Sequence, residues 1–179
     1  MKIFISWSGP RSQAVATALH DWLRKVIHRL EPWVSASDPD QGAGHQDEIG
    51  RHLLEARFGI VCLTPENLDS RWISFEAGAV STAVGNSQVW TYLLDLTPPQ
   101  VEGPLSHLNH IRAEKKGTRE LIFTINKALH ENSIDEAILS KAFNLYWPQL
   151  EDELKSCLRL RPRPDPPGPS EMMQSKVRT

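Results

Sequence analysis

The side chain whose type and position best suit chemistry is the carboxylate of Glu76. It follows an apolar run at 59–63, which predicts a strand, and a turn at 64–67. A helix is expected to begin after this turn, near Asp69 or Ser70, because either short side chain can accept a hydrogen bond from a first-turn N–H. A carboxylate just beyond the carboxyl end of a strand is well placed to act on a ligand.

The helix that carries Glu76 leaves two interpretations open. Its buried face is marked at helical spacing by Ile73, Ala77, Val80 and Val84. Glu76 lies at the edge of this face, on the same side as Trp72 four residues earlier. Partial shielding by an indole and a phenyl ring would favour a reactive carboxylate. The alternative is a solvated helix carboxylate, which is the usual setting of a surface glutamate.

The elements that must position Glu76 follow from the hydrophobic pattern. Strands are predicted at 2–7, 33–37, 58–63 and 89–96, and the ambiguous stretch 105–113 allows a short edge strand at 110–112. Helices are predicted from a cap at Ser12 to Leu30, at 45–57, at the Glu76 segment, at 121–129, and at 134–157 with an interruption at Pro148. This alternation predicts an α/β fold, a doubly wound parallel sheet with helices on both faces. Ligands bind such sheets at the carboxyl ends of the strands, where the loops 8–11, 38–44, 64–70 and the loop after Leu96 are expected.

Composition limits the classes of function. With 40% hydrophobic and 23% charged residues, the chain can form a core. The net charge of -2 gives no bulk attraction to nucleic acid or to anionic membranes, so neither is expected as a partner. Cys62 and Cys157 show no metal or disulfide spacing, which fits a reducing compartment. Without a signal peptide or a transmembrane run, a cytoplasmic location is expected.

Three segments together resemble the bacterial kind of Toll/interleukin-1 receptor (TIR) domain. The segment 2–7 resembles the first box of that family, a strand that ends in Phe-Ile-Ser and an aromatic residue. The segment 37–44 resembles the long loop after the second strand, and Trp72-x-x-x-Glu76 resembles the motif of enzymatic TIR domains. The resemblance covers residues 1–130 and implies a flavodoxin-like fold. Residues 131–158 then form a C-terminal helical extension, and residues 159–179 a Pro/Arg-rich disordered tail.

The resemblance implies an activity. In enzymatic TIR domains the matching glutamate is catalytic in cleaving the nicotinamide–ribose bond of NAD, which gives nicotinamide and linear or cyclised ADP-ribose. Glu76 is therefore the expected catalytic residue, because a carboxylate stabilises the oxocarbenium-like centre of such a reaction. NAD is the substrate, so no separate cofactor and no metal are expected. The implied setting is anti-phage immune signalling, with self-association among TIR domains.

Residues expected to bind the substrate lie around the same end of the sheet. They are Ser6, Trp7, Ser8, Trp33, Asp38, Gly42 and Trp72. Trp7 and Trp33 offer stacking faces for a base, although core aromatics that close strand ends are the equal alternative. The chain departs from some NAD-cleaving relatives, which carry arginine directly after the first-box aromatic. Here the nearest base is Arg11, so Ser8 and the backbone amides near Gly9 are expected to contact phosphate instead.

The loop 38–44 is expected to lie over the site and to touch a neighbouring TIR domain, because its small, turn-forming residues permit a change of conformation. A plain solvent loop is the alternative. In a lone small domain, activity can be restrained simply by a site that is completed only when copies of the domain assemble. Activity is therefore expected to depend on self-association.

Other sites are less well supported by the sequence. Gly42-Ala43-Gly44 is followed by Asp47 where a redox dinucleotide fingerprint needs glycine. His107 and His110 have no third ligand for a metal, and Ser6, Ser8 and Ser35 lack a His/Asp partner order for a hydrolase triad. Two alternatives to the NAD hydrolase remain. One is a non-enzymatic TIR–TIR signalling module, and the other is a nucleoside deoxyribosyltransferase-like enzyme with a catalytic glutamate.

Overall fold

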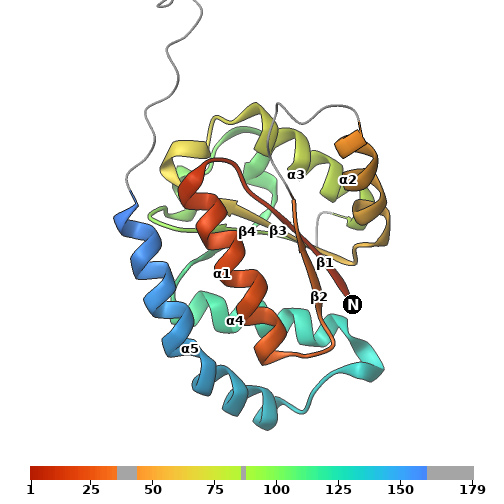
Figure 1. The fold of residues 1–179 in the computed structure, drawn as a ribbon, viewed down its shortest axis with the longest axis vertical. Coiled ribbons are helices and arrows are strands. Elements are labelled where there is room, and N and C mark those ends of the chain that lie inside the picture. Colours follow the sequence, from red (N-terminus) through yellow and green to blue (C-terminus); the bar gives the residue numbers. More distant parts are fainter. Residues whose placement is uncertain (36–43, 86–87, 161–179) are drawn as a thin grey trace, which may run out of the picture.

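A five-stranded parallel sheet is the centre of the fold in the computed structural model (Figure 1). Its strands are β1 (Lys2–Ser6), β2 (Glu31–Val34), β3 (Phe58–Leu63), β4 (Val89–Leu93) and β5 (Asn109–Arg112). They lie in the order β2-β1-β3-β4-β5 and all pair in parallel. This is the strand order of flavodoxin-like doubly wound sheets, so the predicted fold class is confirmed.

The structure describes residues 1–35, 44–85 and 88–160, and all side chains of these ranges except those of residues 44–49 and Trp72. Residues 161–179 of the predicted disordered tail therefore lie outside the described residues, as does most of the predicted loop 38–44. Arg159, which was predicted to begin the tail, instead ends the last helix. No helix within the described ranges is both long enough and apolar enough to cross a membrane.

Two layers of helices cover the sheet (Figure 1). One face carries α1 (Pro10–Val26), α4 (Lys115–Ala128) and α5 (Glu136–Arg159), and the other carries α2 (Gly44–Glu55) and α3 (Arg71–Val84). Short 3-10 helices lie at η1 (Pro65–Asn67), η3 (Pro98–Gln100), η4 (Gly103–His107) and η5 (His130–Asn132). Because side chains alternate along a strand, β1 serves both layers: Ile3 and Ile5 pack in the α1 layer and Phe4 in the α3 layer.

Two proline positions correct the predicted boundaries of the first half. The first helix begins at Pro10 and not after a cap at Ser12, because proline suits the first helical position, where its missing N–H is not needed. The N-cap is Gly9, whose positive φ of 86° is a backbone conformation that glycine adopts readily. The helix ends at Val26, and Pro32 lies inside β2, which is possible because β2 is an edge strand.

The predicted interruption at Pro148 is wrong, because α5 continues through it. Pro148 lacks the N–H that would bond the carbonyl of Asn144, but both residues are exposed, so water can satisfy that carbonyl. Packing on α1 holds the helix together across this point. Trp22 Nε1 donates to the Tyr146 carbonyl at 3.1 Å, and the rings of Trp22 and Phe143 meet edge to face at 5.8 Å. Tertiary contacts thus outweigh the local effect of proline.

The close approach of α3 to the sheet gives a stability prediction. A Cβ added at Gly59 in β3 would overlap Cγ1 of Val80, whose branched side chain has little freedom to move. Gly59→Ala is therefore expected to lower the free energy of unfolding by about 1–3 kcal/mol through overpacking.

The matched variant is Gly78→Ala, on the exposed side of α3, where an added Cβ meets nothing within 4 Å. Here alanine is expected to stabilise by about 0.5–1 kcal/mol, because glycine is a poor helix former. Urea unfolding of both variants checks the pair. Equal changes of the same sign would show that α3 does not press on β3 at Gly59.

Candidate functional site

Glu76 is fully buried at the carboxyl ends of two neighbouring strands. It lies in the second turn of α3, and that helix begins after the N-cap Ser70, as predicted; the Ser70 hydroxyl accepts a bond from Ile73 N at 3.3 Å. The relative exposure of Glu76 is 0%, so the alternative of a solvated carboxylate is wrong. The adjacent phenyl ring of Phe75 is 63% exposed and does not account for this burial.

Two serine hydroxyls hold the Glu76 carboxylate. Ser6 Oγ, at the end of β1, and Ser35 Oγ, directly after β2, both donate to Glu76 Oε2, the second at 3.1 Å. The two serines meet because β1 and β2 are parallel neighbours whose carboxyl ends lie at the same edge. A buried carboxylate requires such donors, since desolvation without them would cost several kcal/mol. From the sequence, Ser35 was weighed for chemistry only as a member of a hydrolase triad, and its contact with Glu76 was not predicted.

The loop between β3 and α3 is tied to the loop after β1. Asn67 is buried, and its Nδ2 donates to the carbonyls of Ser8 (3.1 Å) and Cys62 (3.0 Å). Ser70 Oγ donates to Ser8 Oγ at 3.0 Å. Ser8, a predicted phosphate ligand, thus holds together the loops at this end of the sheet, and its N–H donates to Ser12 Oγ at 3.3 Å.

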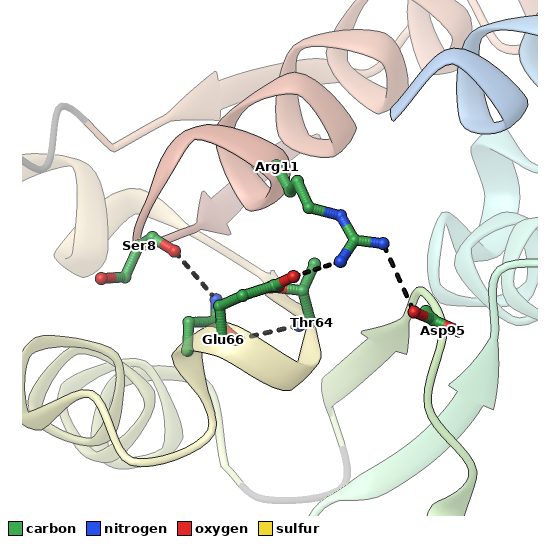
Figure 2. A network of polar contacts seen from close by, with 6 residues as sticks. Ser8, Arg11, Thr64, Glu66 and Asp95 are labelled. Atoms are coloured by element: carbon green, nitrogen blue, oxygen red, sulfur yellow. Dashed lines mark hydrogen bonds and ion pairs between the residues drawn. The ribbon is translucent and has the colours of Figure 1, made fainter. Parts of the chain in front are cut away.

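Arg11 forms a second link at this end of the molecule. Arg11 is 8% exposed, and its guanidinium lies between Glu66, after β3, and Asp95, after β4 (Figure 2). Nη1 pairs with Glu66, and Nη2 lies 3.4 Å from Asp95 Oδ2. Two carboxylates therefore pair with the base nearest to the first-box segment in this conformation.

The contacts around Arg11 also lower the pKa of the Glu66 carboxyl. Burial alone would raise the pKa of this carboxyl, but hydrogen bonds from Thr64 and from the Glu66 backbone, together with the Arg11 guanidinium, hold the pKa below its ordinary value. Glu66 is therefore an ionised partner of Arg11 at neutral pH.

Trp7 and Trp33, the two tryptophans predicted to stack on a base, both contact other side chains or backbone groups of the protein. Trp7 is 9% exposed, belongs to the core of the α1 layer, and donates from Nε1 to the Ser35 carbonyl. Trp33 stacks on His52 of α2, with 4.0 Å between ring centroids, and packs against Phe4 at 5.2 Å. These contacts favour the interpretation of both rings as core aromatics.

Three predicted site residues are not placed by the structure. Asp38 and Gly42 lie outside the described residues, and Trp72 belongs to the first turn of α3 with its side chain also outside. Of the predicted set, the structure brings Ser6 and Glu76 together and places Ser8 on the neighbouring loop. Asn67 was seen in the sequence only as a turn residue.

Neither metal nor thiol chemistry finds support in the described part of the chain. Among the side chains of residues 1–35, 50–85 and 88–160 that the structure describes, no three of His, Cys, Asp or Glu are arranged to hold a metal ion. His110 Nδ1 instead forms a hydrogen bond with Thr91 Oγ1, at 2.6 Å. Cys62 and Cys157 are both buried free thiols, and burial strongly raises the pKa of Cys62, so it is a poor nucleophile.

Comparison with known proteins gives one family match in sequence. The family model for the TIR domain matches residues 3–122. No curated protein matches this chain. Among solved structures, the chain is similar to the TIR domains in the activated Roq1 resistosome that directly recognises the pathogen effector XopQ. That likeness has a TM-score of 0.43 and 15% identity, and it covers 88% of this chain and 97% of the other.

The Arg11–Glu66 pair gives a prediction for acid stability. A carboxyl whose pKa is lowered by folding stabilises the protein above its unfolded pKa, and this contribution is lost as pH falls through the folded pKa. Glu66→Gln is therefore expected to cost on the order of 1 kcal/mol at pH 7, since the pair is partly exposed. The deficit should shrink as pH falls below the ordinary value of 4.5.

Urea unfolding of wild type and variant at pH 7 and pH 3.5 measures this difference. Glu102→Gln is the control, because that carboxylate is exposed and has no ion pair among the described residues. A deficit for Glu66→Gln that stayed constant down to pH 3.5 would mean that loss of the Glu66 charge is not its cause.

Proposed function

Because the TIR domain match spans more than half of its length, the chain belongs to the TIR domain family, and we propose that it cleaves the nicotinamide–ribose bond of NAD. The catalytic residue in this proposal is Glu76, and the products are nicotinamide and linear or cyclic ADP-ribose. The observation that carries it is a buried carboxylate, in Trp-x-x-x-Glu spacing, at the carboxyl ends of β1 and β2. The proposed setting is anti-phage immune signalling in the cytoplasm, a role implied by the resemblance to bacterial TIR domains.

The chemistry suits a carboxylate held by neutral donors. As the C1′–N bond breaks, nicotinamide leaves with the electron pair and positive charge develops on the ribose. A nearby carboxylate stabilises that charge most where water is excluded. For the linear product the reaction is completed when water adds to C1′ and loses a proton, and for a cyclic product a nucleophilic atom of the same ADP-ribose molecule adds there in place of water. Ser6 and Ser35 orient Glu76 by donating to the same oxygen, and neither serine adds a positive charge that would oppose the developing one.

Access to Glu76 sets a condition on this activity. With 0% exposure, the carboxylate has no surface that NAD can touch in the described conformation. The competent conformation must therefore differ from the described one, and we assign its stabilisation to self-association with other TIR domains. Ser6, Trp7, Ser8, Trp33, Asp38, Gly42 and Trp72 stay the proposed NAD-binding residues in that conformation, in which Trp7 and Trp33 would have to give up their present contacts with Ser35 and His52. No resident cofactor is required.

The same burial also favours a second candidate function. A carboxylate bonded to Ser6 and Ser35 links α3 to β1 and β2, which is a purely structural role in a TIR domain that only binds other TIR domains. Activity measurements separate the two candidates, because only the first releases nicotinamide.

Glu76→Gln is the direct test of the catalytic role. Glutamine keeps the shape and an oxygen that can accept from Ser6 and Ser35, but it removes the charge that stabilises the cationic centre. NAD turnover is expected to fall by about a hundredfold or more, with the fold retained. Nicotinamide release and circular dichroism of the same preparations measure the two effects.

The matched control is Glu120→Gln, an exposed carboxylate of α4 that should keep full turnover. Parallel incubation with a deoxynucleoside tests the transferase alternative through release of the base. Full NAD turnover by a folded Glu76→Gln protein would exclude the catalytic assignment. A wild type that is inert toward both substrates, even when associated, would leave the structural role.

Dependence on assembly gives a further prediction. If a neighbouring copy stabilises the competent conformation, specific activity should rise steeply with protein concentration or with a crowding agent. The net charge of -2 offers little repulsion against such association. NAD turnover per molecule over a wide dilution series, with light scattering on the same samples, is the measurement. A flat profile from a monomeric protein would show that the single chain is already competent.

A further inference from the structure

Two loops of the chain repeat the same local motif. Thr64-Pro65-Glu66-Asn67 follows β3, and Thr97-Pro98-Pro99-Gln100 follows the end of β4. In each, the terminal amide oxygen accepts from the backbone N–H of the threonine, at 2.8 Å in both cases. Both therefore cap one turn of 3-10 helix in the same way. The local requirement of the turn is met equally by Asn67 and Gln100.

The two amides differ in what the nitrogen does. Gln100 is exposed, and its described side-chain bonds go to Thr97 alone. Asn67 is 3% exposed, and its Nδ2 donates to two carbonyls outside its own turn, those of Ser8 and Cys62. The bond to Ser8 joins residues 59 positions apart in the sequence. The nitrogen of Asn67 thus has a function that the turn itself does not require.

This nitrogen lies in a closed path that contains the catalytic group of the proposed function. From Ser6 the backbone leads to Ser8, whose carbonyl accepts from Asn67 and whose hydroxyl accepts from Ser70. Ser70 caps α3, and one and a half turns later Glu76 accepts from Ser6. Figure 2 shows Ser8 facing the loop that carries Thr64 and Glu66, with Arg11 on the far side of Glu66. These bonds therefore fix the position of the start of α3 relative to the end of β1.

We propose that Asn67 is a positioning residue, which sets the place of Glu76 relative to the end of β1 through its bond to the Ser8 carbonyl. The inference rests on the proposed NAD cleavage. Loss of the bond would let the start of α3 shift against β1, and displacements of about 1 Å at a catalytic group can lower rates about a hundredfold. The effect falls on kcat, because Asn67 does not itself contact the substrate.

Asn67→Asp isolates the nitrogen. It keeps the oxygen that accepts from Thr64 N, but it places a second oxygen opposite the carbonyls of Ser8 and Cys62. Asn67→Ala, which carries no buried charge, removes all of these bonds and is the second variant. Gln100→Ala is the matched control, since it removes the same local cap without any bond across the loops. All three are compared with wild type under conditions in which association and folding are verified.

The expected result is a fall in kcat of about 10- to 100-fold for both Asn67 variants, per folded molecule and with KM within about threefold. Gln100→Ala should keep the wild-type kcat. Amide hydrogen exchange should become faster at both residues 8–13 and residues 71–75 in the Asn67 variants only. A merely structural role would lower the melting temperature while leaving kcat of the folded protein unchanged, and that outcome would overturn the proposal.

The exchange measurement keeps this test separate from that of the function. If wild type never releases nicotinamide, the proposed function fails, and coupled exchange at the two segments still decides whether Asn67 holds Glu76 in place. Exchange in Asn67→Asp that matches Gln100→Ala would then overturn the positioning role. Faster amide exchange at both segments would instead support the positioning role of Asn67, with Glu76 then acting as a structural carboxylate.

Discussion

The bond between the buried Glu76 carboxylate and the hydroxyls of Ser6 and Ser35 constrains the rest of this end of the molecule. A charge without exposed surface requires donors at fixed positions, and these donors come from the carboxyl ends of two neighbouring strands, Ser6 at the end of β1 and Ser35 directly after β2. Their meeting depends on the strand order, which places β1 beside β2 and sends α3 to the same face as Ser6. The hydrogen bonds of the Glu76 carboxylate therefore depend directly on the strand order of the sheet.

The sequence predicted those parts of the fold that depend on local chemistry. The apolar run of β3 gave its bounds of Phe58–Leu63, because a central strand covered on both faces has no polar interruption. Ser70 was one of two expected caps of α3, since its short side chain suits that position. The family motif indicated Glu76. What these have in common is that each depends on neighbours within a few residues.

Features that depend on distant neighbours were missed. Nothing in the sequence around Ser35 shows that it lies beside Glu76, 41 positions away, because only the assembled sheet brings them together. Asn67 looked like a turn residue for the same reason: its Oδ1 caps its own turn, whereas its Nδ2 bonds the carbonyl of Ser8, 59 positions away in the loop after β1. Pro148 shows the converse, a local signal overruled by the packing of α5 on α1.

Burial of Glu76 also determines how any activity could be controlled. In the proposed function, an open arrangement in which NAD reaches Glu76 while the two serine bonds persist lies a few kcal/mol above the described one, as is typical of a minor state. A difference of that size leaves the open arrangement at about 1% or less of the molecules. In the proposed function, a neighbouring copy can then activate NAD cleavage without new catalytic groups, provided that it binds the open arrangement more tightly by a similar amount. The serine bonds that place the carboxylate at the strand ends are kept in both arrangements in this view, and only the groups that shield Glu76 from solvent have to move.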